Sequence, residues 1–382
     1  MKPDITLIFP ESDFLINQAV FPPLGLMYVA SYFKNKGMSV QCLDLGIGHT
    51  LDMIEADIVG ISITTPQRNN AFNIISKIDN KTIIAGGPHA THKRKECIEN
   101  GCHIVVCGEI EQYNNIDIVP FPDRNVLPIK EYKYFIDSIP ATTIMTSRGC
   151  PFNCSFCARI SKKCNIQSPE RTVNEIINIY ENYGFKAFMI FDDVFTTSKK
   201  RVKKIVELLD NETFIFRCFS RANMLDDEMC ELLRKLNVKE VGIGIESGSQ
   251  KVLNMNMKGT TVKHNTEAIK NLHKVGIKAK AFLIVGLPEE DEESIKETES
   301  WIVDASPDDV DISIFQPLPG SDIFNNPQKY KIQFNYDSNA QWYKGTPKKY
   351  ISNIRTGKLT EGDIVFHRDR LEDLYKNKEL LK

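Results

Sequence analysis

The feature that most constrains the fold is a repeated alternation of short apolar segments with amphipathic ones. In residues 1–112 the candidate strands are short, rich in β-branched residues and bounded by Gly, Pro or Asp. Nearly continuous apolar strands are typical of a parallel sheet that is covered on both faces. We therefore expect a doubly wound, Rossmann-like α/β domain, with its ligand site beyond the C-terminal ends of the strands. The expected strands are Ile5–Phe9, Ser39–Leu43, Ile58–Ile63, Thr82–Ala85 and His103–Val106, and the expected helices are Leu24–Asn35, Gln67–Ile78 and Thr91–Glu99.

A second alternation fills residues 142–321, after a Pro-rich linker over residues 113–141. Six strand candidates with helices between them predict a partial (β/α)6 barrel, and barrels place their chemistry at the C-terminal strand ends. Residues 322–382 are polar and weakly periodic, so we expect a short C-terminal extension with one or two helices. The expected strands lie near Thr142–Met145, Ala187–Phe191, Phe214–Phe219, Glu240–Ile245, Lys278–Val285 and Val310–Phe315; the helices include Val173–Tyr183, Lys200–Leu209, Asp226–Leu236, His264–Val275 and Glu292–Val303.

The composition excludes several classes of protein. The chain has 382 residues, a formal charge of −2 and 42% hydrophobic residues, which is the balance of an ordinary globular protein. This charge argues against a nucleic-acid binder that relies on a strongly basic surface. No uncharged apolar run approaches the ~20 residues that span a bilayer, and the N-terminus lacks the features of a signal peptide. We expect a cytoplasmic protein without membrane association, whose ten cysteines stay reduced and serve metal ligation, catalysis or burial.

The most informative motif is the cysteine-rich segment directly after the first barrel strand. Cys150, Cys154 and Cys157 form CxxxCxxC, and three thiolates on one tight loop can hold three irons of a [4Fe-4S] cluster. The fourth iron then remains open to a small molecule. The alternatives are a coincidental spacing and structural zinc, and zinc needs four ligands that usually come as CxxC pairs. Cys164 is the nearest fourth ligand, but the chain has no second CxxC.

At these residues the chain resembles the radical SAM superfamily. The family signature is CxxxCxΦC, with an aromatic residue, here Phe156, before the last cysteine. The resemblance covers most of the chain, because further segments match the family at the ends of successive barrel strands. One departure is Phe282, which stands where the family's GxIxG strand has its first glycine. The matching segments are Phe191–Phe195, Ser220–Arg221 together with Arg217, Gly242–Gly248, Phe282–Pro288 and Phe315–Ser321.

The resemblance implies that SAM binds the open iron and either yields a 5′-deoxyadenosyl radical or gives up a methyl group. It assigns Phe156, Asp193, Ser220, Glu246 and Lys258 to SAM binding, and it identifies no catalytic residue. From the residues alone, Asp193 also suits a helix cap and Lys258 a solvated surface position. Glu246 is the stronger candidate, since a carboxylate flanked by Gly-Ile-Gly-Ile and Ser-Gly is costly to bury without a partner.

Residues 1–112 resemble the cobalamin-binding domain that precedes the barrel in cobalamin-dependent radical SAM enzymes. The resemblance implies that loops of small residues admit a flat corrin, and we assign Gly25, Thr64, Gly86 and Gly87 to this contact. The DxHxxG motif that supplies a histidine to cobalt elsewhere is absent, so we expect no histidine ligand and interpret His89 as a solvated turn residue. The alternative is a domain that serves only as a lid. The matching segments are Pro22–Ala30, Asp57–Ser62, Gly86–Ala90 and Val106–Glu109.

Together these motifs predict a cobalamin-dependent radical SAM methyltransferase that acts on an unactivated carbon. The alternatives are ring formation or rearrangement, a methylthiotransferase-like enzyme, and a non-catalytic, cluster-bearing nucleotide-binding protein. A methylthiotransferase needs a second cluster, whereas we interpret Cys97, Cys102 and Cys107 as ordinary buried or half-buried residues. The expected partners are a small-molecule or peptide substrate and a flavodoxin- or ferredoxin-type electron donor. Aromatic residues of the extension that either line the substrate pocket or anchor packing are Trp342, Tyr343 and Tyr350.

Overall fold

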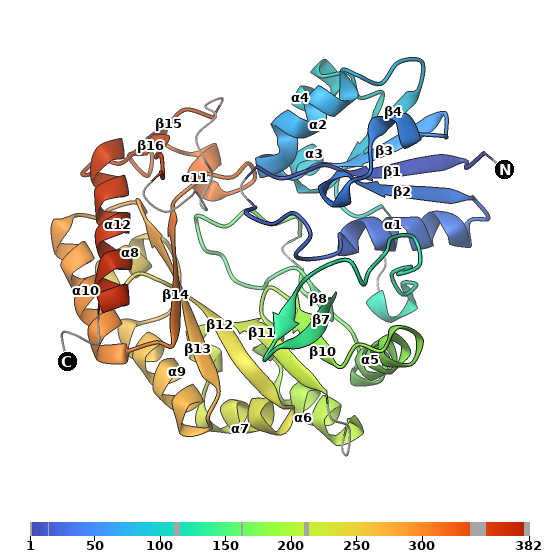
Figure 1. The fold of residues 1–382 in the computed structure, drawn as a ribbon. Coiled ribbons are helices and arrows are strands. Elements are labelled where there is room, and N and C mark those ends of the chain that lie inside the picture. Colours follow the sequence, from blue (N-terminus) through green and yellow to red (C-terminus); the bar gives the residue numbers. More distant parts are fainter. Residues whose placement is uncertain are drawn as a thin grey trace.

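The computed structural model describes residues 2–13, 15–110, 115–161, 163–209, 214–336 and 349–377. The chain builds two main sheets with their helices, and a C-terminal segment reaches from one unit to the other (Figure 1). This α/β architecture, an open sheet followed by a curled one, confirms the fold class expected from the sequence. Trp342 and Tyr343 lie outside the described residues, as does the expected boundary at residue 112.

The N-terminal sheet is parallel throughout, with the order β2-β1-β3-β4-β5. The order changes direction beside β1, which is the switch point where doubly wound sheets bind ligands. The expected third helix is divided at Lys93, whose backbone leaves the helical region. The strands are β1 (Ile5–Phe9), β2 (Val40–Asp44), β3 (Ile58–Ser62), β4 (Thr82–Gly86) and β5 (Ile104–Val105); the helices are α1 (Leu24–Asn35), α2 (Arg68–Ile75), α3 (Pro88–His92) and α4 (Arg94–Glu99), with 3-10 turns η1 (Leu45–Ile47), η2 (Leu51–Met53) and η3 (Thr65–Gln67).

The second sheet curls into a half-barrel with the order β14-β13-β12-β11-β10-β7-β6. Six of its strands are parallel, as expected, and β6 adds an antiparallel strand at one edge. The strands are β6 (Phe135–Ile136), β7 (Ile139–Ile144), β10 (Ala187–Ile190), β11 (Ile215–Ser220), β12 (Val238–Glu246), β13 (Lys278–Val285) and β14 (Asp309–Ile314). The helices are α5 (Pro169–Tyr183), α6 (Lys199–Leu208), α7 (Asp227–Lys235), α8 (Gln250–Met255), α9 (Val262–Lys274) and α10 (Glu292–Ala305), with η5 (Phe195–Thr197) and η6 (Ala222–Met224).

The two units share hydrophobic packing rather than meeting only through a tether. Leu24 and Met27 of α1 are buried in the same hydrophobic core as the strands and helices of the half-barrel. The connecting segment, which carries η4 (Ile116–Ile118), is itself structured, because it supplies β6 and the start of β7. Within it, the Tyr132 hydroxyl donates to Asp44 at the end of β2, at 2.6 Å. Burial of these contacts fixes how the two sheets face each other.

The C-terminal segment contacts both units. The helix α12 (Glu361–Asn377) lies along α10 and the edge strand β14 (Figure 1), where the Arg368 guanidinium donates to the Ile312 carbonyl at 3.2 Å. The short elements α11 (Asp322–Asn325), β15 (Gln333–Phe334) and β16 (Ile354–Arg355) lie nearer the N-terminal sheet. There the Tyr336 hydroxyl donates to Glu96 of α4 at 2.9 Å. Among the described residues, no helix combines the length and apolarity that crossing a membrane would require.

Candidate functional site: two facing sheet edges

The cysteine loop begins where the first parallel strand of the half-barrel ends. A two-stranded ribbon, β8 (Ser147–Arg148) paired with β9 (Asn165–Ile166), closes the base of the loop. Gly149 follows β8 with a positive φ of 83°, and an added Cβ would lie 2.4 Å from the Lys163 carbonyl oxygen. Only glycine therefore fits directly before Cys150. Inside the loop, Arg159 donates to the Cys150 and Phe152 carbonyls and fixes the path of the chain.

The three loop cysteines suit a cluster better than a single ion. Cys150 and Cys154 are half-buried and Cys157 is exposed, and the three thiols interact electrostatically with one another. Among the described residues, no group of three His, Cys, Asp or Glu side chains is placed to hold one metal ion. A [4Fe-4S] cluster binds each cysteine through a different iron, so its ligands stand farther apart than those of zinc. Burial raises the pKa of Cys150, so cluster assembly has to displace its proton.

The adjacent carboxylates Asp192 and Asp193 follow β10 and differ in environment. Asp192 is fully buried, and it accepts hydrogen bonds from the Thr146 amide at 2.6 Å, the Thr146 hydroxyl at 2.6 Å and the Ser147 amide at 3.0 Å. It therefore holds the strand end from which the cysteine loop departs. Asp193 is exposed and interacts electrostatically with Cys150 and Cys157, which leaves its carboxylate available to a ligand beside the loop.

A buried ion pair lies at the end of β12. The Lys258 ammonium donates to Glu246 at 2.7 Å, and both residues are less than 10% exposed. Glu246 has a positive φ of 65° at a register shift of the β12–β13 pair, a strained position for a residue other than glycine. An added Cβ on Gly244 would approach both charged groups within 3 Å, so this glycine makes room for the pair. The Lys258 ammonium also lies 5.9 Å from the Phe156 ring of the cysteine loop.

Arg221 is the residue that sequence reasoning missed as a cluster contact. Its guanidinium lies 3.6 Å from the Cys154 sulfur and stacks over the Phe152 ring at 4.0 Å. This contact places a positive charge beside a thiol that would bind iron. The expected contact Ser220 is instead bonded to Thr196, with 2.6 Å between the two hydroxyl oxygens, and is buried. Two features of the sequence could have indicated this contact: an arginine directly after a barrel strand, and a phenylalanine inside the CxxxC segment.

Buried hydrogen bonds connect the cysteine loop to the C-terminal segment. Ser155 lies between Cys154 and Cys157; its amide donates to the Asn256 carbonyl at 3.1 Å, and its own carbonyl accepts from the Ile323 amide at 3.1 Å. The Asn256 side chain donates to the Pro288 carbonyl at 3.2 Å. Asn256 therefore connects the cysteine loop to the loop after β13.

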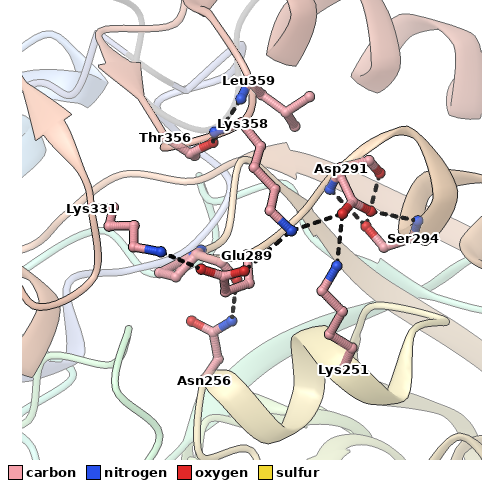
Figure 2. Close-up of polar contacts among 10 residues, drawn as sticks. Lys251, Asn256, Glu289, Asp291, Ser294, Lys331, Thr356, Lys358 and Leu359 are labelled. Carbon is pink, nitrogen blue, oxygen red and sulfur yellow. Dashed lines mark hydrogen bonds and ion pairs between the residues drawn. The ribbon is translucent and has the colours of Figure 1, made fainter.

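A network of ion pairs also lies at the surface around the loop after β13 (Figure 2). Lys358 pairs with Asp291 at 2.9 Å and Glu289 at 3.2 Å, while Lys251 and Lys331 reach the same carboxylates. Single exposed ion pairs contribute little, but several charges in one network hold the C-terminal segment against the half-barrel.

The residues assigned to the corrin lie at the C-terminal edge of the N-terminal sheet. Gly86 ends β4 and Gly25 lies in the first turn of α1; neither has an atom within 4 Å of an added Cβ, so both border open space. Gly87 has a φ of 99°, and its added Cβ would lie 2.8 Å from the Ile63 carbonyl oxygen. Thr64 donates to Gln67 at 2.6 Å and starts the turn into α2. The edge combines tight backbone turns with unfilled space, which suits a broad, flat ligand.

His89 is not the solvated turn residue expected from the sequence. It is fully buried, because α3 packs it beneath the sheet edge against Phe72. Its Nδ1 lies 3.2 Å from the Thr65 hydroxyl and its Nε2 lies 3.6 Å from Glu96. His49, after η1, accepts a hydrogen bond from the Asp44 amide at 2.9 Å. Each imidazole is held through its Nδ1, and the burial of His89 keeps its ring inside the domain.

The cysteines of the N-terminal domain do not form a second three-thiol loop. Cys97 and Cys102 are buried, and the Cys102 amide donates to the Cys97 carbonyl at 3.0 Å. Cys107 is exposed rather than half-buried, with its sulfur 3.8 Å from the Ala90 carbonyl. The buried pair is therefore explained by packing within the domain.

The two edges meet at the start of the cysteine loop. Glu109, beyond β5, pairs with Arg148 of β8 at 2.8 Å. The same guanidinium lies over the Tyr28 ring of α1 at 4.7 Å, one turn from Gly25. Ligands bound at the two edges would therefore be neighbours.

Comparison with known proteins identifies both units. The radical SAM superfamily model matches residues 144–302, and the B12 binding domain model matches residues 18–114. An uncharacterized methyltransferase of Pyrococcus horikoshii is 28% identical over 90% of this chain and 86% of that protein. An anaerobic magnesium-protoporphyrin IX monomethyl ester cyclase of Rubrivivax gelatinosus is 26% identical over 80% of this chain and 66% of that protein. The structure of the radical SAM methyltransferase TsrM from Kitasatospora setae, with cobalamin and a [4Fe-4S] cluster bound, matches with a TM-score of 0.67 and 15% identity over 89% of this chain and 81% of that chain.

The chain is therefore a radical SAM protein with an N-terminal B12-binding domain, as its motifs indicate. Its cofactors are a [4Fe-4S] cluster and SAM in the half-barrel and cobalamin at the N-terminal domain. The likeness to TsrM confirms the two-part fold. Which residues contact each cofactor stays a prediction, drawn from the geometry described above.

Proposed function

We propose that this protein is a cobalamin-dependent radical SAM methyltransferase that acts on an unactivated carbon. The observation that carries the proposal is the Glu109–Arg148 contact, which joins the edge of the N-terminal sheet to the cysteine loop. Methyl transfer through cobalamin requires SAM, corrin and substrate to reach a common space. The name of the Pyrococcus horikoshii relative supports the same reaction class.

The residues present fit all three cofactors. When bound, these cofactors supply an electron, a methyl group and its carrier, while the protein binds and orients them. Lys258 offers a cation to the SAM carboxylate, and Asp193 offers a carboxylate to its amino group. The residues that would hold iron are Cys150, Cys154 and Cys157, and those that would border the corrin are Gly25, Thr64, Gly86 and Gly87.

The remaining side chains position these groups. Arg221 holds a positive charge beside Cys154, and Asn256 fixes the backbone of the cysteine loop through Ser155. Glu246 keeps the Lys258 ammonium in place until a ligand carboxylate shares it. On the other edge, His89 is fully buried within the domain, which supports a cobalt without His89 as its ligand.

Anaerobic reconstitution tests the proposal. The protein is loaded with iron, sulfide and hydroxocobalamin, desalted, and then given dithionite and SAM; dithionite replaces the proposed flavodoxin- or ferredoxin-type donor. We expect corrin to be retained, and S-adenosylhomocysteine to form only in the corrin-loaded sample. Corrin loss on desalting, or no SAM-derived product in either sample, would reject the proposal. Retention in a His89→Ala variant tests the expectation that no histidine ligates cobalt.

Ring formation is the second candidate, because the Rubrivivax gelatinosus relative is named a cyclase. The two reactions differ in what SAM becomes. Methyl transfer yields S-adenosylhomocysteine, whereas a ring closure started by hydrogen abstraction yields 5′-deoxyadenosine alone. Chromatography of the reconstituted mixture separates these products. Formation of 5′-deoxyadenosine without S-adenosylhomocysteine in the corrin-loaded sample would favour the cyclase reaction.

A further inference from the structure

Three half-buried phenylalanines line the concave face of the half-barrel, outside its hydrophobic core. Phe219 lies in β11 and Phe282 in β13, while Phe191 directly follows β10. Side chains alternate along a strand, and the neighbours Phe216 and Cys218 of β11 are fully buried on the opposite, helix-covered face. The three rings therefore point into the half-barrel and not into its core.

The rings form a continuous apolar surface, which we call the phenylalanine shelf. The Phe191 and Phe219 rings are parallel within 2°, with centroids 6.5 Å apart; the Phe282 ring is inclined by 59° to Phe219, with centroids 5.8 Å apart. Gly242 of β12 lies beneath the last two rings: an added Cβ would approach Phe282 at 2.7 Å and Phe219 at 2.8 Å. Because Gly242 has no side chain, the Phe219 ring of β11 and the Phe282 ring of β13 contact each other over β12.

The phenylalanine shelf adjoins the ion pair that we assign to SAM. Gly242 and Gly244 are successive residues on the same face of β12, about 7 Å apart along the strand. The rings lie over Gly242, and the Glu246–Lys258 pair lies over Gly244. A molecule resting on the rings would therefore lie beside bound SAM. The Phe21 ring meets Phe191 edge-on at 4.9 Å and connects the shelf to the N-terminal unit.

Toward the N-terminal ends of the strands the concave face becomes charged. Arg217 pairs with Glu240 at 2.6 Å and Lys280 pairs with Asp309 at 2.6 Å. A small cavity of about 90 Å³ lies there, lined in part by Arg217 and Glu240. These charges are matched with each other, so the shelf divides a polar end of the half-barrel from the reactive rim. A substrate on the shelf therefore contacts the rings rather than these ion pairs.

We propose that the phenylalanine shelf binds a flat, unsaturated ring system of the substrate and holds it beside SAM. This inference rests on the proposed function, because it names the substrate class of the same site. Contact with the parallel Phe191 and Phe219 rings, with the inclined Phe282 ring at one side, favours a flat ligand over a puckered one of equal carbon skeleton, since the flat one makes closer contact over its face. Phe282, where the family has glycine, supplies one of the three rings.

A matched pair of probes tests the inference. Calorimetric titration of the iron-, corrin- and SAM-loaded protein compares 2-naphthol with decahydro-2-naphthol, which has the same skeleton and hydroxyl but puckered rings. We expect 2-naphthol to bind about tenfold more tightly. Phe219→Leu keeps apolar volume without a ring and should remove this preference, whereas Phe33→Ala, which loses a half-buried ring of α1, should keep it. Thermal melting confirms that each variant is folded.

Two results would overturn the inference: equal affinity for both probes, or a preference that survives Phe219→Leu. A fall in SAM affinity in Phe219→Leu, with probe binding unchanged, would assign the rings to the adenine of SAM instead. Probe binding does not depend on methyl transfer. If the loaded protein forms no SAM-derived product while the preference for 2-naphthol holds, the proposed function is wrong and the shelf remains a ring-binding site.

Discussion

The two sheet edges that face each other are built in opposite ways. The half-barrel edge is fixed by buried polar contacts, such as Asp192 with the Thr146 amide and Lys258 with Glu246. The N-terminal edge is fixed by backbone turns and leaves open space at Gly25 and Gly86. A small charged ligand and a cluster are bound by side chains at fixed positions, whereas a broad corrin requires a surface with enough open space. We therefore expect that removing side chains weakens ligand binding at the half-barrel edge, and that adding side chains weakens it at the N-terminal edge.

The largest expected effect is the loss of a cluster ligand on the half-barrel edge. Cys154→Ala leaves two thiols in the CxxxCxxC motif, and we expect reconstituted iron to fall close to background. Cys97→Ala is the matched control, because Cys97 is buried with Cys102 in the other domain. It should retain full iron. Iron and sulfide analysis with the visible spectrum decides; full iron in Cys154→Ala would reject the assignment, and loss in Cys97→Ala would revive the two-cluster alternative.

The second prediction tests the buried Lys258–Glu246 ion pair. Lys258→Met removes the cation offered to SAM and leaves Glu246 buried without its partner, so SAM affinity should fall by about ten- to a hundredfold. Iron content should not change. Lys251→Met, which removes an exposed lysine of α8 that pairs with Asp291 (Figure 2), is the control. Calorimetric titration with SAM measures both, and equal affinities in the two variants would remove Lys258 from the site.

The half-barrel edge should also respond to pH. Burial raises the pKa of Glu290, in the loop after β13, from 4.5 to about 8, against hydrogen bonds from the Gly286 and Leu287 amides. A carboxyl whose pKa is higher in the folded state stabilises the fold below pH 4.5, and this contribution is lost as pH rises through about 8.

Glu290→Gln should therefore flatten the decline in melting temperature between pH 5 and about 8. The free-energy difference between wild type and variant should amount to a few kcal/mol at most, because one pKa unit corresponds to about 1.4 kcal/mol. Thermal melts at several pH values provide the measurement. Parallel pH profiles for the two proteins would show that Glu290 does not titrate in this range.

The smallest expected effect distinguishes corrin binding from folding stability at the N-terminal edge. Gly86→Leu fills open space and should weaken corrin retention several-fold with little change in melting temperature. Gly87→Ala should instead destabilise the fold by about 1–2 kcal/mol, because its positive φ and the Ile63 carbonyl exclude a side chain. Gly362→Leu in α12, which lies against the half-barrel and away from the N-terminal sheet (Figure 1), is the control. Unchanged corrin retention in Gly86→Leu would place the corrin elsewhere.

The sequence was sufficient for features that depend on local pattern. The six parallel barrel strands and the CxxxCxxC loop follow from strand periodicity and cysteine spacing, which neighbouring residues determine. Burial and long-range partners were not readable in the same way. His89 is buried because a separate helix covers it, and Asn256 matters because Ser155, 101 residues away, bonds to it. The division of the expected third helix at Lys93 and the antiparallel β6 likewise depend on tertiary packing.

In the proposed arrangement, the two edges hold their cofactors side by side. Electron paramagnetic resonance of the corrin-loaded protein tests it most directly, with the cobalt in its Co(II) state and the cluster reduced by dithionite. A nearby paramagnetic cluster speeds the spin relaxation of Co(II), so we predict faster relaxation in the wild type than in Cys154→Ala loaded with the same corrin. Equal relaxation in the two proteins, with both cofactors present in the wild type, would contradict a shared site.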